Sequence, residues 1–440
     1  KWMAAMSKPI VRTLPSLFLW QAITIAAGFV TQIILARTLG PHDKGILDFF
    51  LLVPFVTASI AELGLLSANT YFAGKGTFGL QSLHSNSLIW SAGMGVLMFA
   101  IGIAISVLGS PFASLTDGFF LLALTAIAPS LYYSLWSGLM YGSDETRMVY
   151  RINGIYSLLA LSVYALAVAV GLPLEWLLPL SVVLLFVRGG LSLFSMRSRV
   201  MSSLQFDVPA LRQSLLYGLA LYVGLALNTL HFRVDQFLVE GMLGPAELGN
   251  YALAVRIAEL LWLLDYVVVT ASLYRVTAAG RKEAILATQR LFRSVAVLVA
   301  LPSLVIGLSA PAFIPFMFGE AFRPAIRALW LLLPGIISWR LARSLSPFIS
   351  YQYGKPWYNT LSAAVAFAVN MSINLVLIPR FGIAGAAAAS SISYAVNFVI
   401  IAWMFFHLTK AGFTETFLPR RDDFNIVFAA IREKYVQIIG

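Results

Sequence analysis

The chain contains no cysteine among its 440 residues. That absence excludes disulfide bonds, thiolate catalysis and metal sites built on cysteine. Histidine is also scarce, and the four histidines are too scattered along the chain to suggest a metal-binding cluster. We therefore expect no metal ion and no other cofactor.

Charged residues are few as well. Asp, Glu, Lys and Arg make up 11% of the chain and hydrophobic residues 60%, whereas about a quarter of a typical soluble domain is charged. Apolar runs alternate with short polar breaks, and a helical run of about 20 apolar residues spans the hydrocarbon core of a bilayer. The alternation of apolar and polar residues that a transmembrane strand requires is absent. The predicted fold class is an all-α polytopic membrane protein.

Twelve apolar segments have the length of membrane-spanning helices. They cover residues 13–36, 46–69, 83–108, 119–140, 149–171, 174–196, 214–240, 249–273, 288–309, 325–347, 357–379 and 383–407. The first segment is too long, and too closely joined to the second, to be a cleaved signal peptide.

The net charge of +11 could suggest a nucleic-acid partner, but the positions of the basic residues argue otherwise. With a cytoplasmic N-terminus, twenty Lys and Arg residues fall in cytoplasmic segments, and only Arg37, Lys44, Arg323 and Arg380 fall outside. This bias follows the positive-inside rule and predicts that both termini are cytoplasmic. The basic residues thus reflect topology and anionic membrane lipid, and we expect no nucleic-acid partner.

An internal repeat links the two halves of the chain. The connection Leu39–Gly45 (LGPHDKG) matches Leu243–Gly249 (LGPAELG) without gaps, and Gln32 falls on Gln236 at the same offset. Gly-Pro favours a turn, and the acidic residue can cap the helix that follows. Six predicted spans separate the two copies. An even number of spans keeps the orientation, so the repeat is parallel, with a pseudo-two-fold axis along the membrane normal.

The repeat predicts two six-helix lobes. We expect an N-terminal lobe at 1–200, a cytoplasmic linker at 201–213, a C-terminal lobe at 214–407 and a cytoplasmic tail at 408–440. Within the tail, apolar residues recur at helical spacing from Phe424 to Ile438, with Arg432 and Lys434 on the other face. This pattern predicts a short amphipathic helix that lies on the inner leaflet or docks on a partner.

Four stretches of the chain resemble the MOP flippase superfamily, and most closely its polysaccharide-export (Wzx-type oligosaccharide-lipid flippase) branch. They are Leu35–Pro41, Glu62–Leu65, Val234–Gln236 followed by Leu243–Pro245, and Ile378–Ala387. Each motif alone is weakly specific. Their order and spacing, from the first predicted span to the twelfth, are specific for the superfamily and less so for the branch.

This resemblance implies a flippase rather than an enzyme. It implies alternating access between two lobes, and a polyprenyl-diphosphate-linked oligosaccharide as the substrate. The substrate would cross the bacterial inner membrane toward the periplasm for polysaccharide biosynthesis. The implied partners are the lipid-linked glycan, membrane lipid, H⁺ or Na⁺ as a coupling ion, and a polysaccharide polymerase.

Four charged residues flank the second Gly-Pro turn at membrane depth. Arg233 lies twelve residues before Pro245 and Arg256 eleven residues after it, so at about 1.5 Å per residue both reach one level. Asp235 lies slightly shallower, and Glu259 lies one turn deeper on the same face as Arg256. Two guanidinium groups at one depth could hold a diphosphate. Alternatively, Arg256 could pair with Glu259 or Asp235 and lock the helical hairpin.

Two acidic residues occupy related positions in the two halves. Glu62 in the second predicted span falls beside Asp265 in the eighth when the repeat offset is applied. A carboxylate in the membrane could bind H⁺ or Na⁺ and couple the transport cycle. The alternative is a helix cap or a bond to a neighbouring helix.

Three further arginines lie in the cytoplasmic third of their spans. Arg188 is in the sixth span, and Arg340 and Arg343 share one face of the tenth. Long basic side chains near a membrane surface can extend to the lipid headgroups. They could also line a cationic cavity that binds substrate.

Two other function classes were weighed. A multidrug or cation antiporter of the same superfamily should have a net acidic cavity, whereas the charges expected at bilayer depth lean basic. They are Arg188, Arg233, Arg256, Arg327, Arg340 and Arg343 against Glu62, Asp235, Glu240, Glu259 and Asp265. A membrane glycosyltransferase or polymerase should carry a long extramembrane loop, and none of the predicted outer connections is long. The flippase is the favoured hypothesis, and the antiporter is the alternative.

Overall fold

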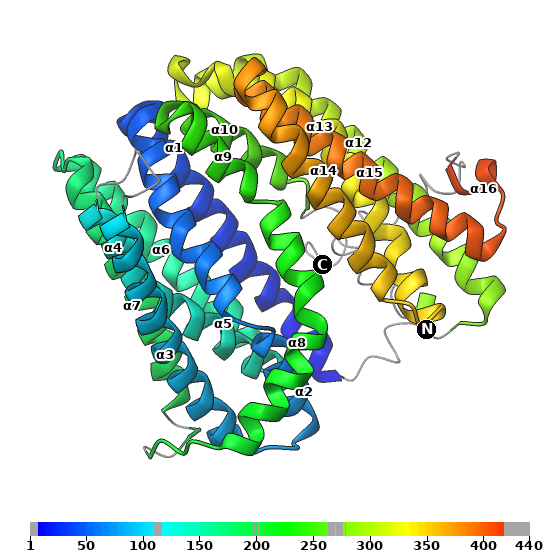
Figure 1. The fold of residues 1–440 in the computed structure, drawn as a ribbon, viewed down its shortest axis with the longest axis horizontal. Helices are drawn as coiled ribbons and strands as arrows, with labels where there is room; N and C mark the ends of the chain where they lie inside the picture. Colours follow the sequence, from blue (N-terminus) through cyan, green and yellow to red (C-terminus); the bar gives the residue numbers. More distant parts are fainter. Residues whose placement is uncertain are drawn as a thin grey trace. The chain divides into compact units, whose positions relative to one another are not determined.

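The computed structural model describes residues 8–108, 117–197, 199–200, 203–262, 269, 276–277 and 279–417. Within these ranges the ordered elements are helices, and no residue lies in a strand (Figure 1). The predicted all-α fold is therefore confirmed. The amphipathic helix predicted within 424–438 lies outside the described residues.

The chain divides into two compact units. The first comprises the residues up to Thr229 together with Gly244–Gly249, and the second comprises Leu230–Leu243 and the residues from Asn250 onward. The unit boundary thus falls inside the seventh predicted span. The division into lobes at 1–200 and 214–407, which rests on the repeat, stays a prediction.

The helices of the first unit are α1 (Lys8–Ala61), α2 (Leu65–Lys75), α3 (Leu80–Leu108), α4 (Asp117–Thr125), α5 (Ile127–Gly142), α6 (Thr146–Ala169), α7 (Leu174–Met196) and most of α8 (Val208–His231). Within this unit α1 packs against α6, and α5 packs against α2, α3 and α7.

The second unit contains α9 (Val234–Leu243), most of α10 (Pro245–Glu259), α12 (Arg281–Phe318), the 3₁₀ turn η2 (Glu320–Phe322), α13 (Pro324–Pro347), the π-helical turn η3 (Phe348–Gln352), α14 (Trp357–Phe381), α15 (Ile383–Thr409) and the short α16 (Phe413–Phe417). Here α15 packs against α13 and α14, and α9 packs against α14.

Ten stretches of the described helices are long and apolar enough to cross a membrane. The first, Ser16–Ala61, contains two predicted spans, because α1 is two helices that meet at Gly40 with φ of 68°. Each of the other nine stretches matches one predicted span. The remaining span is the eighth, 249–273. It begins in α10, and most of its residues after α10 lie outside the described residues. The helices thus agree with twelve spans.

Several spans that the sequence predicts as continuous are interrupted, among them the second and the seventh. In the second span the helix stops at Ala61 and resumes at Leu65, with φ of 46° at Leu63 and 76° at Gly64. In the seventh span α8 and α9 are separated by Phe232 and Arg233. Hydropathy alone does not locate such breaks, because the apolar pattern runs through them.

Side chains from other helices compensate the break in the second span. The indole nitrogen of Trp90 donates to the carbonyl of Ala61 at 2.9 Å, and the hydroxyl of Tyr222 donates to the carbonyl of Ile60 at 2.6 Å. A backbone carbonyl left without a donor in a bilayer costs several kcal/mol. The break is therefore stabilised by α3 and α8.

At the same break the backbone of α8 lies against the backbone of the second span. A Cβ atom on Gly218 would lie 2.8 Å from the carbonyl oxygen of Gly64, which is too short for a real contact. Nearby, the rings of Tyr71 on α2 and Tyr217 on α8 stack with centroids 4.5 Å apart. Glycine at both positions lets the two backbones touch.

We expect Gly218→Ala to destabilise the protein by about 1–3 kcal/mol, because the added methyl group forces the two backbones apart. The measurement is the midpoint of thermal unfolding of the purified protein in detergent. Gly28→Ala is the matched control, since a Cβ atom at Gly28 would meet no atom within 4 Å. Equal midpoints for the two variants would contradict the packing argument.

The two Gly-Pro turns touch each other within the first unit. A Cβ atom on Gly45 would overlap the carbonyl of Pro245, and one on Gly249 would overlap the carbonyl of Pro41. The contact is reciprocal, as a two-fold relation between the repeats requires. The first glycine of each turn also has a positive φ, 68° and 86°. The repeated sequence therefore encodes a repeated turn conformation.

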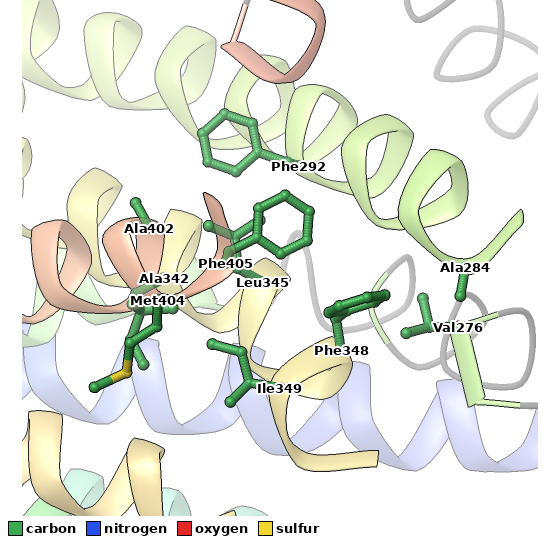
Figure 2. Close-up of a cluster of buried hydrophobic side chains, with 11 residues drawn as sticks. Val276, Ala284, Phe292, Ala342, Leu345, Phe348, Ile349, Ala402, Met404 and Phe405 are labelled. Carbon is green, nitrogen blue, oxygen red and sulfur yellow. The ribbon is translucent and has the colours of Figure 1, made fainter. Parts of the chain in front are cut away.

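A cluster of buried hydrophobic side chains in the second unit forms a core at the junction of α12, α13, η3 and α15 (Figure 2). It includes Phe292, Leu345, Phe348 and Phe405, all at most 1% exposed. The short helix α16 packs beside this core on α12, where the side chain of Gln289 donates to Thr416 Oγ1 at 3.0 Å.

Candidate functional site

The break between α8 and α9 places Arg233 inside the second unit. Its Nη1 donates to Glu259 Oε1 at 2.7 Å and its Nη2 to Glu259 Oε2 at 3.3 Å. The side chains are 20% and 22% exposed, so the pair is largely enclosed but remains accessible. A two-point guanidinium–carboxylate pair fixes both groups in orientation. Arg233 and Glu259, which the sequence placed near one depth, are in direct contact.

Asp235, two residues after Arg233, is buried in the first turn of α9. Its carboxylate accepts hydrogen bonds from the hydroxyl groups of Tyr251 and Ser390, at 2.5 and 3.0 Å, and from the backbone N–H of Gln236 at 2.8 Å. A carboxylate that is 2% exposed needs such partners, because burying an unpaired charge is costly. Asp235 thus ties α9 to α10 and α15.

A buried polar network extends from Asp235 into α14. The amide of Asn370 donates to Ser390 and Ser393 at 3.4 and 3.3 Å, and Asn374 donates to Asn370 at 3.0 Å. His231 Nε2 lies 2.8 Å from the hydroxyl of Ser393. The end of α8 and the helices α9, α10, α14 and α15 therefore contribute polar groups to one network.

A small cavity separates the two carboxylates. It has a volume of about 10 Å³ and is lined by Asp235, Glu259, Trp262 and Tyr394, among others. That is about the volume one water molecule requires. Among the described residues the buried indole N–H of Trp262 has no hydrogen-bond partner, so it could donate to such a water. The cluster suits binding of a small polar group. No set of three or more His, Asp or Glu side chains in the described ranges is placed to hold a metal ion.

Three other predicted arginines lie elsewhere in the second unit. Arg256 is exposed on α10, one turn before Glu259. On α13, Arg340 is partly buried and Arg343 is exposed. Glu259 therefore pairs with Arg233 in the structure, and the substrate-binding role of Arg256, Arg340 and Arg343 stays a prediction.

Arg188 forms a separate cationic site in the first unit. Its guanidinium group donates to Asn153 Oδ1 at 2.7 Å and lies 3.5 Å from the ring centroid of Tyr133 and 5.1 Å from that of Tyr156. In the described part of the chain no carboxylate lies within ion-pair distance of it. Arg188 is therefore held among neutral groups of the first unit. Its role in binding substrate remains a prediction.

Glu62 lies at the break in the second span. Its Oε2 accepts a hydrogen bond from Ser134 Oγ at 2.7 Å. Its proposed counterpart, Asp265, lies outside the described residues. The comparison between the two acids therefore stays a prediction.

Several residues of these sites were not singled out from the sequence. They are Tyr251, Ser390, Asn370 and Asn374 around Asp235, and Tyr133, Tyr156 and Asn153 around Arg188. One usable signal was present, since Asn370 and Asn374 stand one turn apart in the otherwise apolar α14. The tyrosines carried no such signal, because aromatic residues are common throughout membrane spans.

Comparison with known proteins gives three findings. The family model described as "Polysaccharide biosynthesis protein" matches residues 10–278. No curated protein gives a significant match. Several solved structures share the fold at low sequence identity.

One of these structures is an inward-facing multidrug resistance MATE family transporter of the MOP superfamily, with a TM-score of 0.73 at 14% identity, covering 90% of this chain and 99% of that one. The lipid II flippase MurJ in an inward closed conformation gives 0.71 at 12% identity, with 90% of each chain covered. A MOP superfamily transporter from Pyrococcus furiosus, described as having reversed polarity of its binding pocket, gives 0.64 at 13% identity, with 91% and 94% covered.

Proposed function

The chain belongs to the family of polysaccharide biosynthesis proteins, and from this premise we propose that it is a flippase for a lipid-linked oligosaccharide. The MOP-type fold expected from the four sequence motifs is confirmed by the solved structures that resemble it. In the proposed function, a polyprenyl-diphosphate-linked glycan crosses the inner membrane by alternating access. The protein carries out transport and no covalent chemistry.

The observation that carries the proposal is the charge of the sites at membrane depth. In the second unit Arg233 pairs with Glu259, and Arg256 is exposed on the same helix as Glu259. In the first unit Arg188 is held by an amide and two tyrosine rings. A guanidinium group inside a membrane is costly unless it has a function or a counter-charge. These sites suit an anionic ligand such as a diphosphate.

The alternative is an antiporter for cationic compounds. The feature that favours an antiporter is the pair of acidic residues, Asp235 and Glu259, that line the small cavity. However, one of the two is paired with Arg233 and the other accepts three hydrogen bonds. Neither is available to a cationic substrate without breaking these interactions, so the anionic substrate is favoured.

Energy coupling and partners complete the proposal. Glu62, partly buried at a helix break, would take up H⁺ or Na⁺ together with Asp265. A polysaccharide polymerase would use the glycan delivered to the periplasm.

The test is flipping in proteoliposomes that contain a fluorescent undecaprenyl-diphosphate oligosaccharide on one leaflet. We expect the purified protein to transfer the label to the other leaflet, measured by its accessibility to a membrane-impermeant quencher. Arg256→Gln should slow transfer about tenfold or more, because a charge-assisted hydrogen bond contributes about 1.5–3 kcal/mol. The matched control is Arg290→Gln, which alters an exposed arginine on α12.

Two outcomes would contradict the proposal. One is equal transfer by protein-free and protein-containing vesicles. The other is proton-driven export of a cationic dye that is faster than transfer of the labelled lipid, which would establish the antiporter instead.

A further inference from the structure

The segment that precedes α8 is fixed to the start of α3 through every second residue. Three side chains of α3 bond to its backbone: Gln81 to the Ser203 carbonyl at 2.9 Å, Ser85 to the Gln205 N–H at 3.1 Å, and Asn86 to the carbonyl and N–H of Asp207 at 2.8 and 3.0 Å. Contacts at alternate residues are those of an extended chain. The carboxylate of Asp207 then accepts from the Ala210 N–H and caps α8.

The intervening residues point away from α3 and are apolar. Leu204 is 63% exposed, Phe206 54% and Val208 56%. Side chains in an extended chain alternate between two sides. Because residues 203, 205 and 207 are bound to α3, residues 204, 206 and 208 face outward. We call these three residues the linker ridge. Leaving each of them in water forgoes about 1.5–3 kcal/mol of burial. The ridge therefore fits an apolar environment.

A groove on the first turns of α8 adjoins the linker ridge. It has a volume of about 440 Å³ and is lined by Val208, Pro209, Arg212, Gln213 and Leu216. Residues four apart lie on one face of a helix, so Val208, Arg212 and Leu216 form a line along α8. Arg212 is exposed, and within the described ranges no acidic side chain pairs with it. The groove thus combines apolar walls with one uncompensated guanidinium group.

We propose that the groove and the linker ridge bind one anionic phospholipid of the surrounding leaflet. The guanidinium group of Arg212 and the amide of Gln213 donate to the phosphate, and Val208, Pro209 and Leu216 contact an acyl chain. Further along α8 the exposed face is apolar, with Leu219 43% and Val223 56% exposed, as a lipid-facing surface should be. Arg212 is therefore at the boundary between headgroups and acyl chains. The distribution of basic residues predicts that this boundary is the cytoplasmic one.

The bound lipid has a structural consequence for the unit. The linker ridge and α8 share one lipid, so its binding holds the first turn of α8 against the segment that α3 fixes. This site is independent of the proposed transport function, because it would exist whether or not the protein moves a glycan.

The test uses the full chain in phosphatidylcholine nanodiscs that contain a small fraction of phosphatidylglycerol. Native mass spectrometry after release into detergent counts the phosphatidylglycerol molecules that stay bound. We expect Arg212→Gln to reduce retention about fivefold, which corresponds to roughly 1 kcal/mol for one basic residue near a membrane surface. Leu216→Asn should also reduce it without a change of charge. Arg290→Gln, an exposed arginine on α12, should leave it unchanged.

Unfolding midpoints in lipid-free detergent confirm that each variant is folded. Equal retention by the wild type and Arg212→Gln would overturn the proposal and identify the lipid as a non-specific boundary lipid. A second arm replaces phosphatidylglycerol by the same mole fraction of undecaprenyl phosphate. Stronger retention of undecaprenyl phosphate would overturn the assignment to a phospholipid and make the groove a site for the carrier lipid.

Discussion

Replacing Arg233 by glutamine is expected to remove most of the protein from the membrane and to reduce glycan export at least about a hundredfold. The change leaves the carboxylate of Glu259, 22% exposed, without its partner at 2.7 Å. Breaking an enclosed ion pair by removing one member costs about 3–5 kcal/mol, which is enough to unfold a marginally stable protein. Abundance is measured by immunoblotting of membranes, and export by surface glycan per molecule of protein.

The double variant Arg233→Gln with Glu259→Gln separates the structural role from a substrate-binding role. It removes both charges, so no unpaired ion is left and abundance should return to near the wild-type level. If Arg233 also holds the diphosphate, export per molecule should stay low. Recovery of export together with abundance would show that Arg233 serves only the fold.

Joining the two Gly-Pro turns covalently should stop export completely. Alternating access requires the two repeats to separate on each side of the membrane in turn. The turns touch at Gly45 and Pro245 and again at Gly249 and Pro41, so a link between them would prevent one of the two states. The chain has no cysteine, and a pair introduced at the equivalent positions Asp43 and Glu247 therefore reacts without background.

The experiment uses a reducible bifunctional thiol reagent. Export should cease on crosslinking and return on reduction, and each single-cysteine variant treated in the same way should export normally. Complete crosslinking with unchanged export would show that the turns stay together throughout transport, and alternating access would then be wrong for this protein.

The fold could be predicted because its signals are local. A run of about 20 apolar residues specifies a membrane helix wherever it occurs. The Gly-Pro turns also follow from a few adjacent residues, since Gly40 and Gly244 adopt the positive φ that glycine accommodates at no steric cost.

The break in the second span follows from residues that are distant in sequence. Its Ile60 carbonyl is satisfied by Tyr222, which lies 162 residues later in the chain. No sequence pattern near Ile60 indicates that Tyr222 will donate to its carbonyl. The apolar character of the segment therefore predicted one continuous helix.

For the candidate site, the charged residues could be predicted from the sequence, but their partners could not. Charged residues in apolar segments stand out, and helix geometry placed Arg233 and Glu259 near one depth. The partners could not be assigned, because pairing depends on how the broken helix turns the Arg233 side chain. Likewise Ser390 reaches Asp235 across 155 residues of sequence.

The break beside Gly64 bears on the order in which the protein can mature during synthesis. The donor to the carbonyl of Ala61 lies in α3, which is synthesised soon after the second span. The donor to the carbonyl of Ile60 is Tyr222 in α8, which is synthesised much later. Until α8 has been inserted, an open break would expose a bare carbonyl to lipid, so an unbroken helix is the more stable form of the nascent second span. The mature shape of this span is thus reached only after α8, the last helix of the first unit to be synthesised before the second unit begins, has been inserted. A chain cut before α8 would carry every residue of the break and still lack the donor for Ile60.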